Sequence, residues 1–148
     1  MAHDANEIYK KLVGIRKSKD LKLSPNPYLR PEYQLRYYQT QGVAHMYMVK
    51  RFVLGDDCGL GKTLTTLATY TSIYSKRKEQ KLMIICPSSA MYQWQSEVKK
   101  FCTDDITCQI VKSADIKVID GVKLKSKDYL KSFDAREYLF KQFEKNDN

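Results

Sequence analysis

The sequence predicts an α/β protein with a parallel sheet flanked by helices, in the P-loop class. A short apolar run, residues 52–54, is followed by a loop with two glycines and then by a helical segment. A second run, residues 82–86, is apolar without alternation, which is typical of a parallel strand covered on both faces. A strand, a helix and a second strand form a βαβ unit, which is normally right-handed. We therefore expect a doubly wound sheet with its ligand at the carboxyl ends of the strands.

The first half of the chain contains the clearest predicted elements. Residues 1–22 predict a basic amphipathic helix, and prolines at positions 25, 27 and 31 predict an extended linker. Residues 35–50 predict a helix with Leu35, Tyr38, Gly42, Met46 and Val49 facing the core. The P-loop strand is expected over residues 49–54 and a solvated connection over 75–81. The helix between them is expected over 63–74, with Leu64, Leu67, Ala68 and Thr71 on its inner face.

The second half contains weaker patterns. A helix ending at Phe101 is expected after Ser88 or Ser89, either of which can cap it. Residues 107–112 predict a third strand, and Asp120-Gly121 predicts the turn of a hairpin over residues 116–124. Residues 127–144 predict a final helix.

These elements divide the chain into three regions. Residues 1–31 form an N-terminal helix and linker. Residues 32–112 form a partial nucleotide-binding lobe. Residues 113–148 form a lysine-rich extension with a hairpin and a helix.

The glycine loop has the composition of a phosphate-binding site. Gly59 and Gly61 allow the backbone to approach an anion closely, and main-chain N–H groups in such a loop point inward. The helix that begins near Lys62 adds the positive end of its dipole. Lys62 suits the β- and γ-phosphates, and the Thr63 hydroxyl suits Mg²⁺. The candidate nucleotide-binding residues here are Asp56, Asp57, Cys58, Gly59, Leu60, Gly61, Lys62, Thr63 and Leu64. The alternative is a glycine-rich turn that only links a strand to a helix.

Three segments resemble one family. Asp56 stands where the general P-loop has its first glycine, and residues 56–64 resemble motif I of the Snf2-type DNA translocases of helicase superfamily 2. Residues 35–43 resemble the Snf2 form of the Q motif, and residues 85–101 resemble motif Ia. The resemblance implies the N-terminal part of a first RecA-like lobe. It also implies that Gln39 reads adenine and that Ser88 and Ser89 contact the phosphate backbone of DNA, expected to be double-stranded.

Each of these residues also has an ordinary structural interpretation. Gln39 can be a surface residue of an amphipathic helix, although its amide offers the donor and the acceptor that adenine needs. Trp94 is expected to pack its helix onto the sheet. For Ser88 and Ser89, helix capping and DNA contact are compatible.

One element that the resemblance requires is missing. In this family an Asp-Glu-x-His box supports Mg²⁺ and the attacking water, and the sequence contains no Asp-Glu pair. Asp120 ends an apolar run, but a hairpin turn explains it better. The motifs of a second lobe are also absent. We therefore expect an incomplete lobe that hydrolyses ATP only when another chain or a further segment supplies these parts. A split gene, a truncation and divergence into a small module all remain open.

Composition agrees with an intracellular nucleic-acid partner. The net charge of +9 suits a polyanion, although it also fits ordinary solubility. The apolar runs are far shorter than the roughly 20 residues needed to span a bilayer. Four cysteines without metal-ligand spacing indicate reduced thiols, so we expect a cytoplasmic or nuclear location.

The favoured function is the ATP-binding part of a DNA-dependent ATPase or translocase, with ATP and Mg²⁺ as cofactors. The alternative is a nucleotide- or DNA-binding module without catalysis, which the missing Asp-Glu pair favours. A small-molecule kinase shares the P-loop but explains neither the Gln39 helix nor the Trp94 segment.

Overall fold

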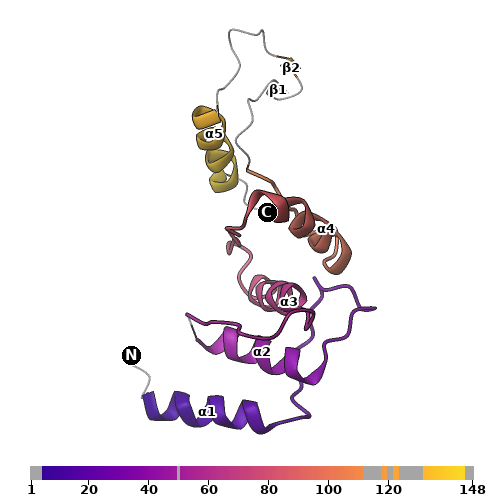
Figure 1. Cartoon of the computed structure of the whole chain (residues 1–148), viewed down its shortest axis with the longest axis vertical. Coiled ribbons are helices and arrows are strands. Elements are labelled where there is room, and N and C mark those ends of the chain that lie inside the picture. Colours follow the sequence, from indigo (N-terminus) through magenta and orange to yellow (C-terminus); the bar gives the residue numbers. More distant parts are fainter. Residues whose placement is uncertain (1–4, 50, 112–117, 120–121, 124–131, 146–148) are drawn as a thin grey trace.

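The computed structural model describes residues 5–49, 51–111, 118–119, 122–123 and 132–145. Its helices lie side by side in a row from α1 to α4, with α5 beyond them (Figure 1). The elements are α1 (Ala5–Lys17), α2 (Tyr37–Met48), α3 (Lys62–Tyr74), the 3₁₀ turn η1 (Ser88–Ala90), α4 (Met91–Phe101), β1 (Val118–Ile119), β2 (Val122–Lys123) and α5 (Ser132–Lys145). None of these described helices is long and apolar enough to cross a membrane.

The N-terminal helix is attached to α2 through polar contacts. The Gln41 amide donates to the carbonyls of Arg16 and Ser18 at 3.1 and 2.7 Å. His45 Nε2 lies 3.1 Å from the carbonyl oxygen of Leu12. The Arg16 carbonyl lies in the last turn of α1, where carbonyl groups have no partner within the helix, so its bond to Gln41 also caps the end of α1. The predicted helix in residues 1–22 is therefore confirmed over Ala5–Lys17, and it is held against α2.

The proline-containing segment has no regular structure, as predicted, but it packs against the helices. The Asn26 amide donates to the Thr71 and Ser72 hydroxyls of α3 at 2.8 and 3.1 Å. The Arg30 N–H donates to the Phe101 carbonyl at 2.8 Å, and a single antiparallel bridge joins Leu29 to Cys102. The segment therefore connects the C-terminal half of α3 to the end of α4.

The main apolar cluster lies between α3 and α4. Its buried members are Leu67, Val98, Phe101 and Cys102, and Trp94 and Leu82 pack against it. Val98 and Phe101 are three residues apart, so they share one face of α4. Trp94 was predicted to pack its helix onto the sheet; it packs inward as expected, but against this cluster and not against a sheet. The predicted inner face of α3 is also confirmed, because Leu67, Ala68 and Thr71 are buried and Leu64 packs against the cluster.

The predicted parallel sheet does not form in the described residues. Residues 51–54, 82–86 and 107–111 carry no strand pairing, and the strands described are one antiparallel pair. Val53 and Ile85 are 88% and 89% exposed, whereas Leu82 packs inward. A parallel strand is stable when both of its faces are covered. Because these side chains stay exposed, neither run is covered on both faces, which is the physical reason for the difference.

The predicted hairpin is confirmed for its two described strands, β1 and β2. β1 pairs with β2 in the register Val118↔Lys123 and Ile119↔Val122, which leaves two residues for the turn. The predicted turn residues Asp120 and Gly121 lie outside the described residues. The final helix is confirmed over Ser132–Lys145 as α5, and the first part of its predicted range, residues 127–131, lies outside the described residues.

Two predictions for local structure are wrong. Neither Ser88 nor Ser89 caps a helix with its side chain: η1 precedes α4, and its last N–H donates to the Pro87 carbonyl. The connection after α3 is also more than a solvated loop. The Lys78 ammonium lies 3.6 Å from the ring centre of Tyr28 and 4.5 Å from that of Tyr74. The two rings pack nearly edge to face. The cation–π contacts of Lys78 therefore hold the connection against these two tyrosines.

The cysteines differ in accessibility, which gives a prediction. Cys58 is exposed and Cys102 is 1% exposed. Burial raises the pKa of the Cys102 thiol to about 11, partly offset by Arg30 and reinforced by Cys108. The folded state thus favours the neutral thiol. This contribution to stability is complete below about pH 9 and is lost as the pH rises toward about 11.

We therefore expect Cys102 to resist alkylation in the folded protein at pH 8. Its rate should be about 100-fold lower than in denaturant, because the thiolate is the reactive form. Mass spectrometry of the labelled peptides measures this rate, and Cys58 is the internal control that should react in both states. Equal Cys102 labelling with and without denaturant would contradict the burial.

Candidate functional site

The glycine loop of residues 55–61 leads directly into the N-terminus of α3. Gly59 and Gly61 have φ angles of 84° and 78°, in the left-handed region where a Cβ is disfavoured. Gly61 is the residue before the helix, and its carbonyl accepts from the Thr65 N–H at 3.0 Å. The helix thus begins at Lys62, where sequence patterns placed it. Its first N–H groups have no partner within the helix, which suits an anion.

The Lys62 side chain folds back over this loop. Its ammonium donates to the carbonyls of Asp56 and Asp57 at 2.8 and 2.9 Å. These carbonyls belong to residues five and six positions earlier, so the ammonium lies across the loop rather than in solvent. A cation held there can also bind an anionic group that approaches the loop.

Gln39 is the second part of the site, and it is buried at 5% exposure. Its Nε2 donates to the Leu60 carbonyl at 3.1 Å, and its Oε1 accepts from the Arg36 N–H at 2.9 Å. The interpretation of Gln39 as a surface residue is therefore wrong. The contact with Arg36 also satisfies a backbone donor at the start of α2, as the second half of a capping box does.

The close approach of Gln39 adds a second reason for glycine at position 61, because a Cβ there would displace the end of the Gln39 side chain. A Cβ built at Gly61 would lie 2.4 Å from Gln39 Nε2, far inside contact distance. At Gly59 the same Cβ would meet nothing within 4 Å. Glycine at position 61 is therefore favoured both by its left-handed backbone and by the lack of space for a Cβ. Glycine at position 59 is favoured by its left-handed backbone alone.

The Gln39 amide keeps hydrogen-bonding capacity beyond these contacts. A primary amide has two N–H donors and two acceptor lone pairs. The Leu60 carbonyl uses one donor, and the Arg36 N–H uses one lone pair. One donor and one acceptor remain, in an orientation that the two existing bonds fix.

Some of the other predicted site residues lie in or next to the glycine loop, and others lie in separate elements. Thr63 is the second residue of α3 and is half-buried. Cys58 is exposed in the loop, and the Leu64 side chain packs against the apolar cluster. Ser88 and Ser89 are exposed in η1, and no hydrogen bond among the described residues joins them to the loop. Asp120 lies outside the described residues.

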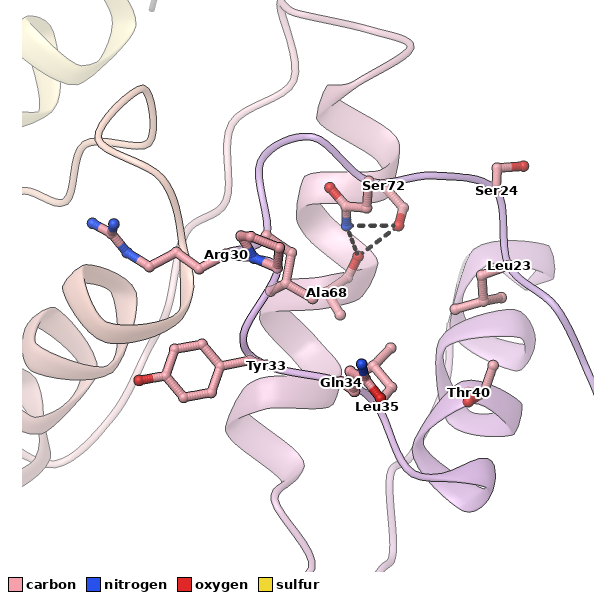
Figure 2. A pocket seen from close by; sticks show the side chains of 12 residues that line it. Leu23, Ser24, Arg30, Tyr33, Gln34, Leu35, Thr40, Ala68 and Ser72 are labelled. Carbon is pink, nitrogen blue, oxygen red and sulfur yellow. Dashed lines mark hydrogen bonds between the residues drawn. The ribbon is translucent and has the colours of Figure 1, made fainter.

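A separate cavity of about 290 Å³ lies between α3 and the proline-containing segment. Figure 2 shows Leu23, Leu35 and Ala68 around it. None of the predicted site residues lines this cavity. The Asn26 amide at its edge is already bonded to α3, so the polar groups there hold the segment in place. The glycine loop is therefore the better candidate for chemistry.

Sequence reasoning missed one contact that positions the site. A Cβ built at Gly42 would lie 3.0 Å from Thr65 Cγ2, so α2 and α3 are close together there. The helical spacing placed Gly42 toward the core, and it lies three residues after Gln39. That spacing was the available signal, but the partner on α3 could not be read from it.

The loop, the buried glutamine and the order of the motifs agree with the resemblance to the Snf2 type. The family model described as "SNF2-related domain" matches residues 38–135. The chain therefore belongs to this family, and the family supports the RecA-like class of fold.

Several curated proteins are similar over about half of the chain. "Switch 2" of Arabidopsis thaliana is 33% identical over 85 residues, which cover 47% of this chain and 10% of that protein. "ATP-dependent helicase fft3" of Schizosaccharomyces pombe is 31% identical over 83 residues, covering 53% and 9%. "TATA-binding protein-associated factor mot1" of Aspergillus fumigatus is 36% identical over 84 residues, covering 46% and 4%. The aligned regions thus span a tenth or less of these relatives. No solved structure matches the chain significantly.

Proposed function

We propose that the chain binds ATP with Mg²⁺ at the glycine loop that begins α3. The observation that carries this proposal is the junction of three groups at one helix N-terminus. Gly61 adopts a left-handed backbone, the Lys62 ammonium lies across the loop, and the Gln39 amide is bonded to Leu60. Family membership supports the same function, because one relative is named as an ATP-dependent helicase.

Each group has a defined role in the proposal. Main-chain N–H groups at the start of α3 hold phosphate oxygens, and Lys62 exchanges its loop carbonyls for the β- and γ-phosphates. The Thr63 hydroxyl is a ligand for Mg²⁺, which neutralises phosphate charge when it is bound. The remaining donor and acceptor of Gln39 pair with adenine N7 and N6. The backbone of residues 56–64 lines the phosphates.

DNA is the proposed macromolecular partner. The exposed hydroxyls of Ser88 and Ser89 precede α4, and hydroxyls contact phosphate without base preference. The net charge of +9 supports a polyanion, and double-stranded DNA fits the Snf2 type. An intracellular location, cytoplasmic or nuclear, follows from such a partner. We propose that residues 32–112 form the nucleotide-binding region. It lies between the N-terminal region of residues 1–31 and the C-terminal region of residues 113–148.

Hydrolysis is proposed to need a further polypeptide. The sequence contains no Asp-Glu pair to support Mg²⁺ and water. Met83, Ile85 and Val53 expose large apolar side chains on two of the three runs that were expected to be strands of the parallel sheet. A polypeptide that carries the Asp-Glu box and the second lobe would cover this face, and the runs would then become strands of a parallel sheet.

Measuring ATP affinity and phosphate release on the purified chain tests this proposal. We expect saturable binding of Mg·ATP without turnover, because the nucleotide site is present and the acidic pair is not. Phosphate release by the chain alone that is lost in Lys62→Ala would contradict the need for a further polypeptide. Absence of ATP binding at millimolar concentration would contradict the proposed function itself.

A further inference from the structure

The nucleotide loop and the Gln39 helix meet at two contacts that are one helical turn apart. On α2, Gln39 is followed three residues later by Gly42, so the two residues lie on one face. On the α3 side, Gly61 is followed four residues later by Thr65. Gln39 contacts the loop at Leu60, and Gly42 faces Thr65. The second contact therefore sets the distance at which the first is made.

The contact at Gly42 leaves no room for a larger residue. Gly42 is buried and Thr65 is fully buried at 0% exposure. A methyl group at position 42 would lie 3.0 Å from Thr65 Cγ2 and 3.6 Å from Leu54 Cδ1. Carbon atoms in favourable contact lie about 3.5–4.0 Å apart, so the helices would have to separate by several tenths of an ångström.

Thr65 cannot easily move out of the way. Its hydroxyl donates to the Gly61 carbonyl at 3.2 Å, and its own carbonyl accepts from the Thr69 hydroxyl at 2.8 Å. Thr65 is thus tied to the residue that ends the glycine loop. Separation of α2 from α3 would instead stretch the 3.1 Å bond between Gln39 and Leu60.

We propose that the Gly42–Thr65 contact determines base selectivity by holding Gln39 in register with the phosphate loop. This inference rests on the proposed binding of ATP, and it concerns how the base is chosen rather than how phosphate is held. Gly42 and Thr65 are positioning residues, since they act through Gln39. The proposed phosphate contacts, Lys62 and the loop amides, belong to α3 and its loop and include no atom of α2, so we expect them to change less than the Gln39 contact.

The test compares Gly42→Ala with a compensating change. We expect Gly42→Ala to reduce the preference for ATP over GTP by about tenfold, the effect of losing one well-placed hydrogen bond. Binding of inorganic tripolyphosphate should change less than about twofold. Addition of Thr65→Ser, which removes Cγ2 but keeps the hydroxyl, should restore the preference. Gly14→Ala is the matched control, because a Cβ there would meet nothing within 4 Å.

Isothermal titration with the three ligands gives the affinities, and the Gln39 side-chain amide signal in NMR gives a readout that needs no nucleotide. That signal should shift in Gly42→Ala and return in the double variant. An unchanged ATP preference, or an equal loss of ATP and tripolyphosphate, would overturn the inference. A wild-type chain that binds neither ATP nor tripolyphosphate would overturn the proposed function. An unmoved Gln39 signal in Gly42→Ala would separately refute the claim that the Gly42–Thr65 contact sets the position of Gln39.

Discussion

Replacement of Lys62 by alanine is expected to weaken ATP binding strongly. The ammonium is the cation that the structure places across the glycine loop, bonded to the carbonyls of Asp56 and Asp57. A charge-assisted hydrogen bond contributes about 1.5–3 kcal/mol, so Mg·ATP affinity should fall roughly 10- to 150-fold. Titration calorimetry on the purified chain measures this loss.

The control for this substitution is Lys10→Ala, which removes an exposed lysine from α1. It should leave the affinity for ATP unchanged within about twofold, because α1 lies against α2 and not against α3. Both variants should keep their thermal unfolding temperature, because the loop carbonyls that Lys62 releases can be hydrated. Equal ATP affinities in Lys62→Ala and the wild type would refute the assignment of the loop.

Replacement of Gly61 by alanine is expected to have the second large effect. The φ angle of 78° costs a residue with a Cβ about 1–3 kcal/mol. The new Cβ would also lie 2.4 Å from Gln39 Nε2 and force that side chain from Leu60. We therefore expect reduced stability together with weaker ATP binding.

Gly59→Ala separates the two causes, because Gly59 has a similar φ of 84° and no neighbour within 4 Å. It should lower the free energy of unfolding by a similar backbone amount but keep the Gln39 contact. Chemical denaturation and ATP titration on the two variants make the comparison. If Gly59→Ala and Gly61→Ala lowered ATP binding equally, the role given to Gln39 would be wrong.

Local sequence signals predicted the helices and the loop well. The start of α3 followed from a glycine pair before Lys62, and the inner face of α3 followed from helical spacing. The α2 helix followed from the same periodicity, although it begins two residues later than expected. Such features depend on residues a few positions apart, which a sequence displays directly.

The parts that failed depend on partners distant in the sequence. The run at residues 82–86 is apolar enough for a buried strand, but strand formation needs a paired neighbour and two covered faces. In the described residues it has neither, and Ile85 is exposed. The packing of Asn26 on α3 and the contact of Gly42 with Thr65 likewise join segments that no local pattern relates.

The candidate site was predictable in its composition and less so in its internal contacts. Lys62 and Gln39 were selected by motif, yet the sequence left open whether Gln39 was on the surface. Its burial and its bond to Leu60 join two motifs that are about 20 residues apart. DNA contact by Ser88 and Ser89 stays a prediction. These residues lie in η1, apart from the glycine loop, so the geometry of the loop does not test their role.

The most direct measurement is an NMR titration of the ¹⁵N-labelled chain with Mg·ATP, following the main-chain amides. A triphosphate bound at the start of α3 should shift the signals of Gly59, Gly61, Lys62 and Thr63 together, with one saturation curve. The Gln39 side-chain signal should follow the same curve for ATP and should not follow it for tripolyphosphate. Saturable shifts confined to another surface, with these loop amides unmoved, would contradict the account.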